Sequence, residues 1–94
     1  MLLKIKTSKG IKLSIEERKI TDFGFVRALA DVESKDESKI LSGWVSLSNI
    51  LFGDKYDEVM ESLKDEDGYT STDEVINEIY FIMNAIKESR EAKK

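Results

Sequence analysis

The sequence predicts a small, mostly α-helical protein with a short β-hairpin at its N-terminus, an α+β fold. Two observations predict it: apolar and polar residues alternate at the start, and the apolar period then becomes helical. The chain has no proline, repeat or low-complexity tract, so we expect no linker to divide it. A chain of this length fits one domain with a modest core. We therefore expect a single domain over residues 1–94, with a hairpin segment at 1–20 and a body of about four helices at 21–90.

The first fifteen residues carry the hairpin pattern. Its apolar positions fall on one face of an extended chain and comprise Leu3, Ile5, Ile11, Leu13 and Ile15, with a polar break at residues 7–10. The other face is rich in lysine, which suits a face turned to water and discourages pairing with strands of other chains. Because a lone two-stranded hairpin is marginally stable, we expect a helix to pack on its apolar face.

Helix start and stop signals begin at Thr21, which can cap a first helix running to about Glu33. Residues 34–37, Ser-Lys-Asp-Glu, fit a capping box and predict a second helix, which Gly53 would end.

Two further helices are predicted after Gly53. Asp54 can cap a third helix from Lys55 to about Lys64. Residues 71–74, Ser-Thr-Asp-Glu, form a second capping box and predict a long final helix that reaches about Arg90.

Most apolar residues of these helices fall on single stripes that would face a core. In the second helix the stripe comprises Ile40, Leu41, Trp44, Val45, Leu47, Leu51 and Phe52. In the final helix it comprises Val75, Ile76, Ile79, Tyr80, Ile82, Met83 and Ile86. We expect these residues to be buried.

Phe23 and Phe81 fall outside these stripes, and Ile50 lies at the edge of its own. Two interpretations of the phenylalanines stay open at this point. Either the hairpin or a neighbouring helix covers them, or they belong to an exposed patch that binds a partner or a second copy of the chain.

The composition leaves little for catalysis. The chain has no cysteine and no histidine, which removes disulfides, thiol nucleophiles, imidazole bases and the usual zinc ligands. The remaining carboxylates, lysines and hydroxyls are also what any solvated surface carries. We therefore expect no enzymatic activity, no metal and no cofactor.

Charge and hydropathy restrict the partners. The net charge is −4, with +4 in residues 1–20 and −8 in residues 21–94, and an acidic body argues against nucleic acid as a partner. No window approaches the roughly 20 apolar residues that span a bilayer, and the N-terminus does not have the pattern of a signal peptide. We expect no membrane association and a cytoplasmic location.

Residues 63–74 lie between two predicted helices and resemble a calcium-binding loop. Asp65, Asp67, Gly68 and Glu74 would take loop positions three, five, six and twelve, but Leu63 stands at position one, where a carboxylate ligand is needed. A turn at Gly68 followed by a helix cap explains the same residues without a metal, and we favour it.

Three segments of the helical part stand in a recognisable order. They are Thr-Asp-Phe-Gly-Phe-Val-Arg-Ala-Leu-Ala-Asp at 21–31, Asn-Ile-Leu-Phe-Gly at 49–53 with Tyr56 close behind, and Leu-Lys-Asp-Glu-Asp-Gly at 63–68. Together they resemble the tail assembly chaperones of long-tailed bacteriophages over roughly residues 21–88. The family often has Asp-Trp where this chain has Asp22-Phe23, and Leu-Leu-Gly where it has Leu51-Phe52-Gly53.

The resemblance implies that the protein coats the tape measure protein in the host cytoplasm, keeps it soluble and recruits tail tube protein. We expect its partner contacts at Phe23, Ile50, Phe52, Tyr56 and Phe81. Homo-oligomerisation is compatible with the same residues. The alternative is a small acidic inhibitor of a host enzyme or defence protein, which would lose binding steeply with salt, unlike a chaperone held by apolar contact.

Overall fold

A computed structural model describes residues 1–91 of the chain. It opens with the predicted hairpin, in which β1 (Leu2–Lys6) pairs antiparallel with β2 (Lys12–Glu16). The strands are in register with Ile5 opposite Leu13. At the turn, Gly10 has a φ of 87°, and its N–H donates to the Thr7 carbonyl at 2.9 Å.

The alternation along the hairpin has the predicted result. The inward side chains Leu3, Ile5, Leu13 and Ile15 are buried, and the outward Lys4, Lys6 and Lys12 are exposed. The prediction of an α+β fold with an N-terminal hairpin is confirmed.

The first predicted helix is divided in two. Helix α1 (Glu17–Thr21) follows β2 directly, and α2 (Phe23–Val32) begins after a break at Asp22. The Asp22 carboxylate accepts from the Gly24 N–H at 2.8 Å and caps α2, so the expected cap at Thr21 was wrong. Thr21 already belongs to α1, where its hydroxyl donates to the Arg18 carbonyl. A carboxylate placed one residue later makes the stronger cap.

Helix α3 (Glu37–Phe52) ends at Gly53 as predicted, because Gly53 adopts a φ of 53°. Its cap is Asp36, which accepts from the Ser38 N–H at 2.9 Å, rather than Ser34. The Ser34 hydroxyl instead accepts from the Asp36 N–H at 3.0 Å. Ser34 therefore orders the turn before the helix.

The last two helices follow a short 3₁₀ turn, η1 (Gly53–Lys55). Helix α4 (Tyr56–Ser62) is shorter than predicted, and α5 (Thr72–Glu91) occupies the predicted position. The described residues therefore form one five-residue helix, α1, and four longer helices, α2–α5. This confirms the expectation of about four helices.

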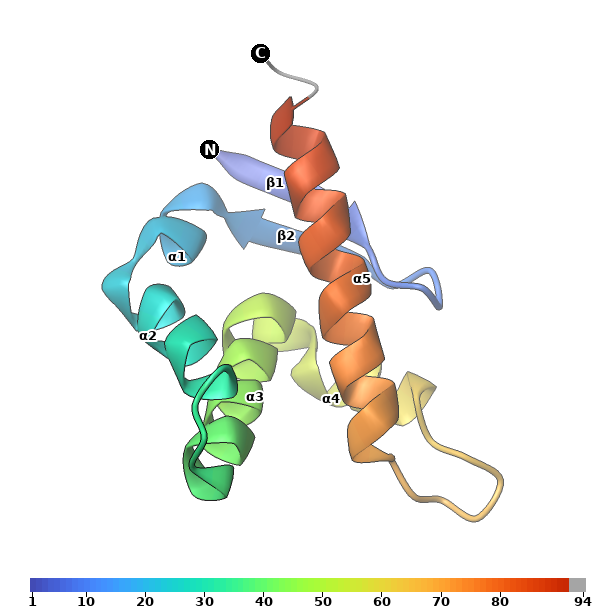
Figure 1. Cartoon of the computed structure of the whole chain (residues 1–94). Helices are drawn as coiled ribbons and strands as arrows, with labels where there is room; N and C mark the ends of the chain where they lie inside the picture. Colours follow the sequence, from blue (N-terminus) through green and yellow to red (C-terminus); the bar gives the residue numbers. More distant parts are fainter. Residues whose placement is uncertain (92–94) are drawn as a thin grey trace.

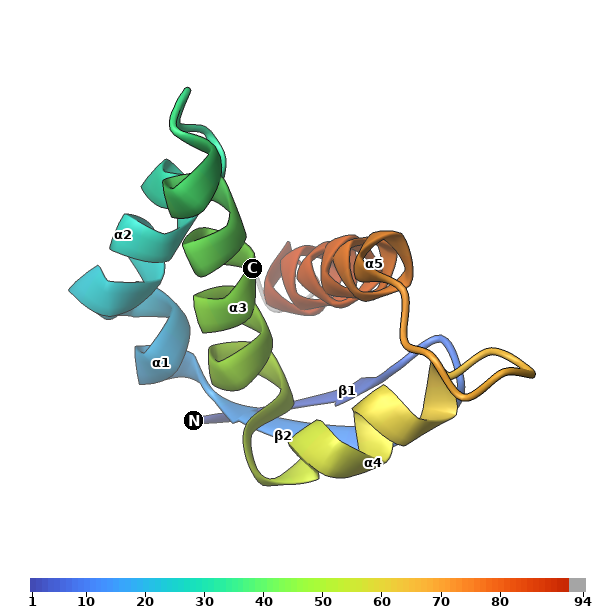
Figure 2. The same ribbon diagram turned by 90° about the horizontal axis from the view of Figure 1, so that it is seen from below.

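Helix α5 crosses the apolar face of the hairpin, and α2 and α3 form an antiparallel pair beside it (Figure 1). Seen from below, α4 lies in front of the hairpin, while α3 and α5 run in clearly different directions (Figure 2). One cluster of buried side chains joins all these elements, and its most enclosed members are Leu3, Leu47, Leu51, Phe52, Val59, Ile79 and Ile82. Hairpin and helices therefore share one core.

Two close contacts hold elements around this core together, one between α2 and α3 and one between the hairpin turn and α5. Gly43 of α3 lies against α2 so closely that a Cβ there would meet the Ala28 carbonyl oxygen at 2.9 Å. Glu78 of α5, which is 3% exposed, accepts from the Ser8 N–H at 2.9 Å and from the Ser8 hydroxyl.

Within residues 1–91, no helix is both long and apolar enough to cross a membrane.

Candidate partner-binding groove

Three side chains predicted to be buried remain exposed. Leu41 and Val45 of α3 are 56% and 57% exposed, and Tyr80 of α5 is 54% exposed. The reason is the direction of α5, which packs on the hairpin and diverges from the N-terminal half of α3 (Figure 2). Within residues 1–91, the outer edge of each apolar stripe is therefore only partly covered.

These edges border an apolar groove between α3, α4 and the start of α5. It encloses about 240 Å³ and is lined by Leu41, Trp44, Val45, Ser48, Tyr56, Met60, Thr70, Thr72, Val75 and Ile76. Seven of these ten residues have apolar or aromatic side chains. Such a surface is typical of a site that receives apolar side chains of another molecule.

Trp44, the single tryptophan of the chain, links the two diverging helices. Its ring lies edge-to-face against Tyr80 of α5, with centroids 5.5 Å apart and an interplanar angle of 71°. Such pairs favour this geometry and stabilise it beyond simple burial. The pair therefore fixes the spacing of α3 and α5 beside the groove.

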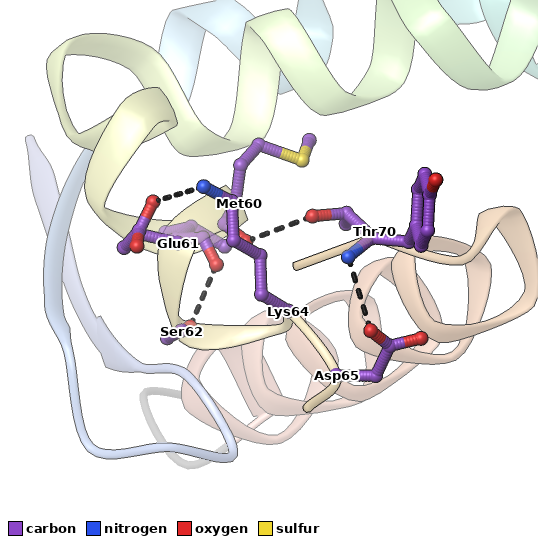
Figure 3. Close-up of polar contacts among 8 residues, drawn as sticks. Met60, Glu61, Ser62, Lys64, Asp65 and Thr70 are labelled. Atoms are coloured by element: carbon purple, nitrogen blue, oxygen red, sulfur yellow. Dashed lines mark hydrogen bonds and ion pairs between the residues drawn. The ribbon is translucent and has the colours of Figure 1, made fainter. Parts of the chain in front are cut away.

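The loop between α4 and α5 forms the other wall. The Thr70 hydroxyl donates to the Met60 carbonyl at 3.2 Å (Figure 3). Lys64 and Thr70 also form an isolated antiparallel β-bridge across the loop. The Asp65 carboxylate accepts from the N–H groups of Asp67 and Tyr69. These bonds hold Thr70 and Met60 together in the lining.

The same loop resembles a calcium-binding loop in sequence. Leu63, at the position of the first ligand, is buried in the core, and Asp65 accepts from backbone N–H groups within the loop. Among residues 1–91, no group of three or more acidic side chains is placed to hold a metal ion. The geometry therefore assigns Asp65 a part in the turn.

The structure does not bring the five predicted contact residues together. Phe52 is 1% exposed, so its prediction as a contact residue was wrong: it fills the core, where its ring centroid lies 6.2 Å from that of Tyr56. Tyr56 is half-buried and lines the groove. Ile50 is also half-buried but borders a different, polar depression with Arg18 and Lys19.

Phe23 and Phe81 are exposed, at 78% and 47%, so neither the hairpin nor a neighbouring helix covers them. They do not line the groove. Phe81 follows Tyr80 and is therefore turned by about 100° around α5, away from the groove side. The two rings are separate apolar features on α2 and α5.

One feature of the sequence indicates the groove. The apolar stripe of α3 has seven members and covers a wider arc than one neighbouring helix can bury. Leu41 and Val45 lie at its outer edge. An over-wide stripe therefore indicates a second contact surface, although it does not say whether that surface meets the same chain or another molecule.

A second apolar depression lies between α1, α2 and the C-terminal half of α5. It encloses about 330 Å³ and is lined by Ile20, Phe25, Met83, Ile86, Lys87, Arg90 and Glu91. Arg90 lies 3.5 Å from Glu17 at this edge, joining α5 to α1. Ile20, Phe25 and Ile86 are themselves buried members of the core, so this depression offers less exposed apolar surface than the groove.

Comparison of the chain with protein-family models, curated proteins and solved structures finds no match. The resemblance to tail assembly chaperones therefore stays a prediction, and the geometry of the groove carries the functional argument.

Proposed function

We propose that this protein is a binding protein without catalytic activity, a phage tail assembly chaperone that acts in the host cytoplasm. In this proposal it receives apolar helical segments of the tape measure protein in the groove, keeps that protein soluble and recruits tail tube protein. The observation that carries the proposal is that Leu41 and Val45, which line the groove beside Trp44, stay more than half exposed among residues 1–91.

The energetics suit reversible capture. Full burial of a leucine or valine side chain contributes about 1.5–3 kcal/mol, so covering a half-exposed one contributes about 1 kcal/mol. Leu41, Val45 and Tyr80 are each about half exposed. Several such contacts must act together to exceed the entropy lost on association, which allows the bound segment to be released when the tail assembles.

Co-expression with the tape measure protein of the same phage tests the proposal. The wild-type chain should keep that protein in the soluble fraction, whereas Val45→Asp should leave it insoluble, because a charge then enters the groove. Val26→Asp is the matched control, since Val26 is 49% exposed on α2 and does not line the groove. Equal solubility with both variants would contradict the proposal.

The charge distribution favours a second candidate, an acidic inhibitor of a host enzyme or defence protein. Residues 54–78 contain ten Asp and Glu against two Lys. An inhibitor that imitates phosphate would lose affinity steeply between 50 and 500 mM salt, whereas groove binding driven by apolar contact would change little. Salt dependence of partner binding therefore separates the two candidates.

A further inference from the structure

We propose that the helix received by the groove is cationic: apolar on the face that enters, with lysine or arginine along its flanks. This inference rests on the proposed role of the groove in binding a partner. It adds the chemistry of the occupant, which the apolar lining alone does not define.

The length of the groove suits one face of a helix. Its α3 wall extends from Leu41 to Ser48, about 10 Å at 1.5 Å per residue, or two helical turns. A helix presents side chains at i, i+3 or i+4, and i+7 over the same distance. Two or three bulky side chains of an incoming helix can therefore meet the wall in turn.

Acidic residues occur on all three helices within one turn of residues that line the groove. Glu37 lies one turn before Leu41 on α3, Asp57 is next to Tyr56 on α4, and Asp73 is one turn before Ile76 on α5. All three carboxylate residues are exposed. We call Glu37, Asp57 and Asp73 the acidic rim.

The two lysines of residues 54–78 do not offset the acidic charge of that segment. In residues 54–78, Lys55 lies 3.6 Å from Glu58 and Lys64 lies 2.7 Å from Glu61, so each lysine already has an acidic partner within its own turn. Because residues 54–78 carry ten Asp and Glu against these two lysines, the side of the groove formed by α4 and the start of α5 is strongly negative. This charge favours a cationic ligand and repels an acidic one.

Two synthetic helical peptides with the same leucine face, one flanked by lysines and one by glutamates, provide the test. Trp44 fluorescence reports binding, because the single tryptophan lines the groove. Each exposed ion pair changes Kd about twofold, so three pairs should make the lysine peptide bind roughly tenfold more tightly at 50 mM salt. The difference should shrink at 500 mM salt.

Neutralising the acidic rim with Glu37→Gln, Asp57→Asn and Asp73→Asn should remove the preference while leaving the glutamate peptide unaffected or tighter. The matched control neutralises Glu33, Glu88 and Glu91, which are exposed and do not line the groove, and it should retain the preference.

Equal affinity for the two peptides, or a preference that survives neutralisation of the rim, would overturn the inference. So would failure of both peptides to bind. The proposed chaperone function fails separately, if Val45→Asp still keeps the tape measure protein soluble.

Discussion

Glu78 is a single acidic residue that joins the two ends of the chain. Its carboxylate is buried where α5 crosses the hairpin, and Ser8 supplies both hydrogen-bond donors from a position 70 residues away. A buried carboxylate is stable only when it has such partners. The contact therefore fixes how the hairpin turn lies against α5.

Replacing Glu78 with alanine should lower the free energy of unfolding by about 1–3 kcal/mol, because the Ser8 donors lose their acceptor. Urea unfolding followed by circular dichroism measures the change. Glu88→Ala, at an exposed position of the same helix, should change it by less than about 0.5 kcal/mol. Equal effects would contradict the role of Glu78.

Phe52 and Phe23 form a matched pair with opposite surroundings, at 1% and 78% exposure. Phe52→Ala should cost about 3–5 kcal/mol, because it leaves a cavity in the core. Phe23→Ala should change stability by less than about 0.5 kcal/mol. Thermal unfolding of both variants checks this, and a large loss for Phe23→Ala would show that the ring is covered in solution.

At the scale of elements, close contact between α2 and α3 depends on Gly43. An added Cβ would lie 2.7 Å from Val32 Cγ1 as well as 2.9 Å from the Ala28 oxygen. In an uncrowded helix, Gly→Ala stabilises by about 0.5–1 kcal/mol. The packing here reverses that sign.

Gly43→Ala should therefore destabilise the protein by about 1–3 kcal/mol, because α2 and α3 must move apart. Denaturant unfolding gives the value. Ser42→Ala, on the exposed side of the same helix, serves as the control and should be neutral or slightly stabilising. A gain in stability for Gly43→Ala would mean that the two helices separate without cost.

The cap of α3 makes stability depend on pH. The hydroxyl and N–H of Ser38 donate to Asp36 and hold the pKa of its carboxyl below the usual range. A carboxyl whose pKa is lower in the folded than in the unfolded protein stabilises the fold at pH values above its unfolded-state pKa. This stabilisation is lost as the pH falls through the folded-state pKa.

Asp36→Asn keeps a capping side chain but does not titrate. The thermal midpoint of the wild type should therefore be higher than that of Asp36→Asn at pH 7, and this difference should be smaller at pH 2. The difference should decrease below about pH 4. Thermal unfolding of both proteins across this range measures it. A difference that stays constant with pH would contradict the assignment.

At the scale of the whole molecule, a single core predicts one cooperative transition. Leu3 of β1 is 1% exposed, so Leu3→Ala should cost about 2–5 kcal/mol and should destabilise helices and hairpin together. Trp44 fluorescence and far-ultraviolet circular dichroism should give the same urea midpoint in this variant. Separate midpoints would show that the hairpin unfolds independently.

Local sequence patterns predicted the positions of helices and strands well, but they did not predict how these elements pack. The hairpin followed from alternation, and the end of α3 followed from Gly53, because both are determined by neighbouring residues. Asp22 and Asp36 replaced the expected caps because several capping residues compete within a few positions.

The groove and the burial of Glu78 depend on where α5 lies. The apolar period of α5 does not show that this helix crosses the hairpin and diverges from α3. The sequence therefore predicts Leu41 and Val45 to be buried, whereas both are more than half exposed. Only the tertiary arrangement brings Ser8 to Glu78. The site therefore required the structure, whereas the fold class did not.

The hairpin is translated well before α5, the helix that crosses its apolar face. Leu3, Ile5, Leu13 and Ile15 thus stay open to water, or to other nascent chains, until α5 has been translated. The outward lysines of both strands are present throughout that interval and discourage premature pairing. Completion of the shared core therefore waits for the translation of α5.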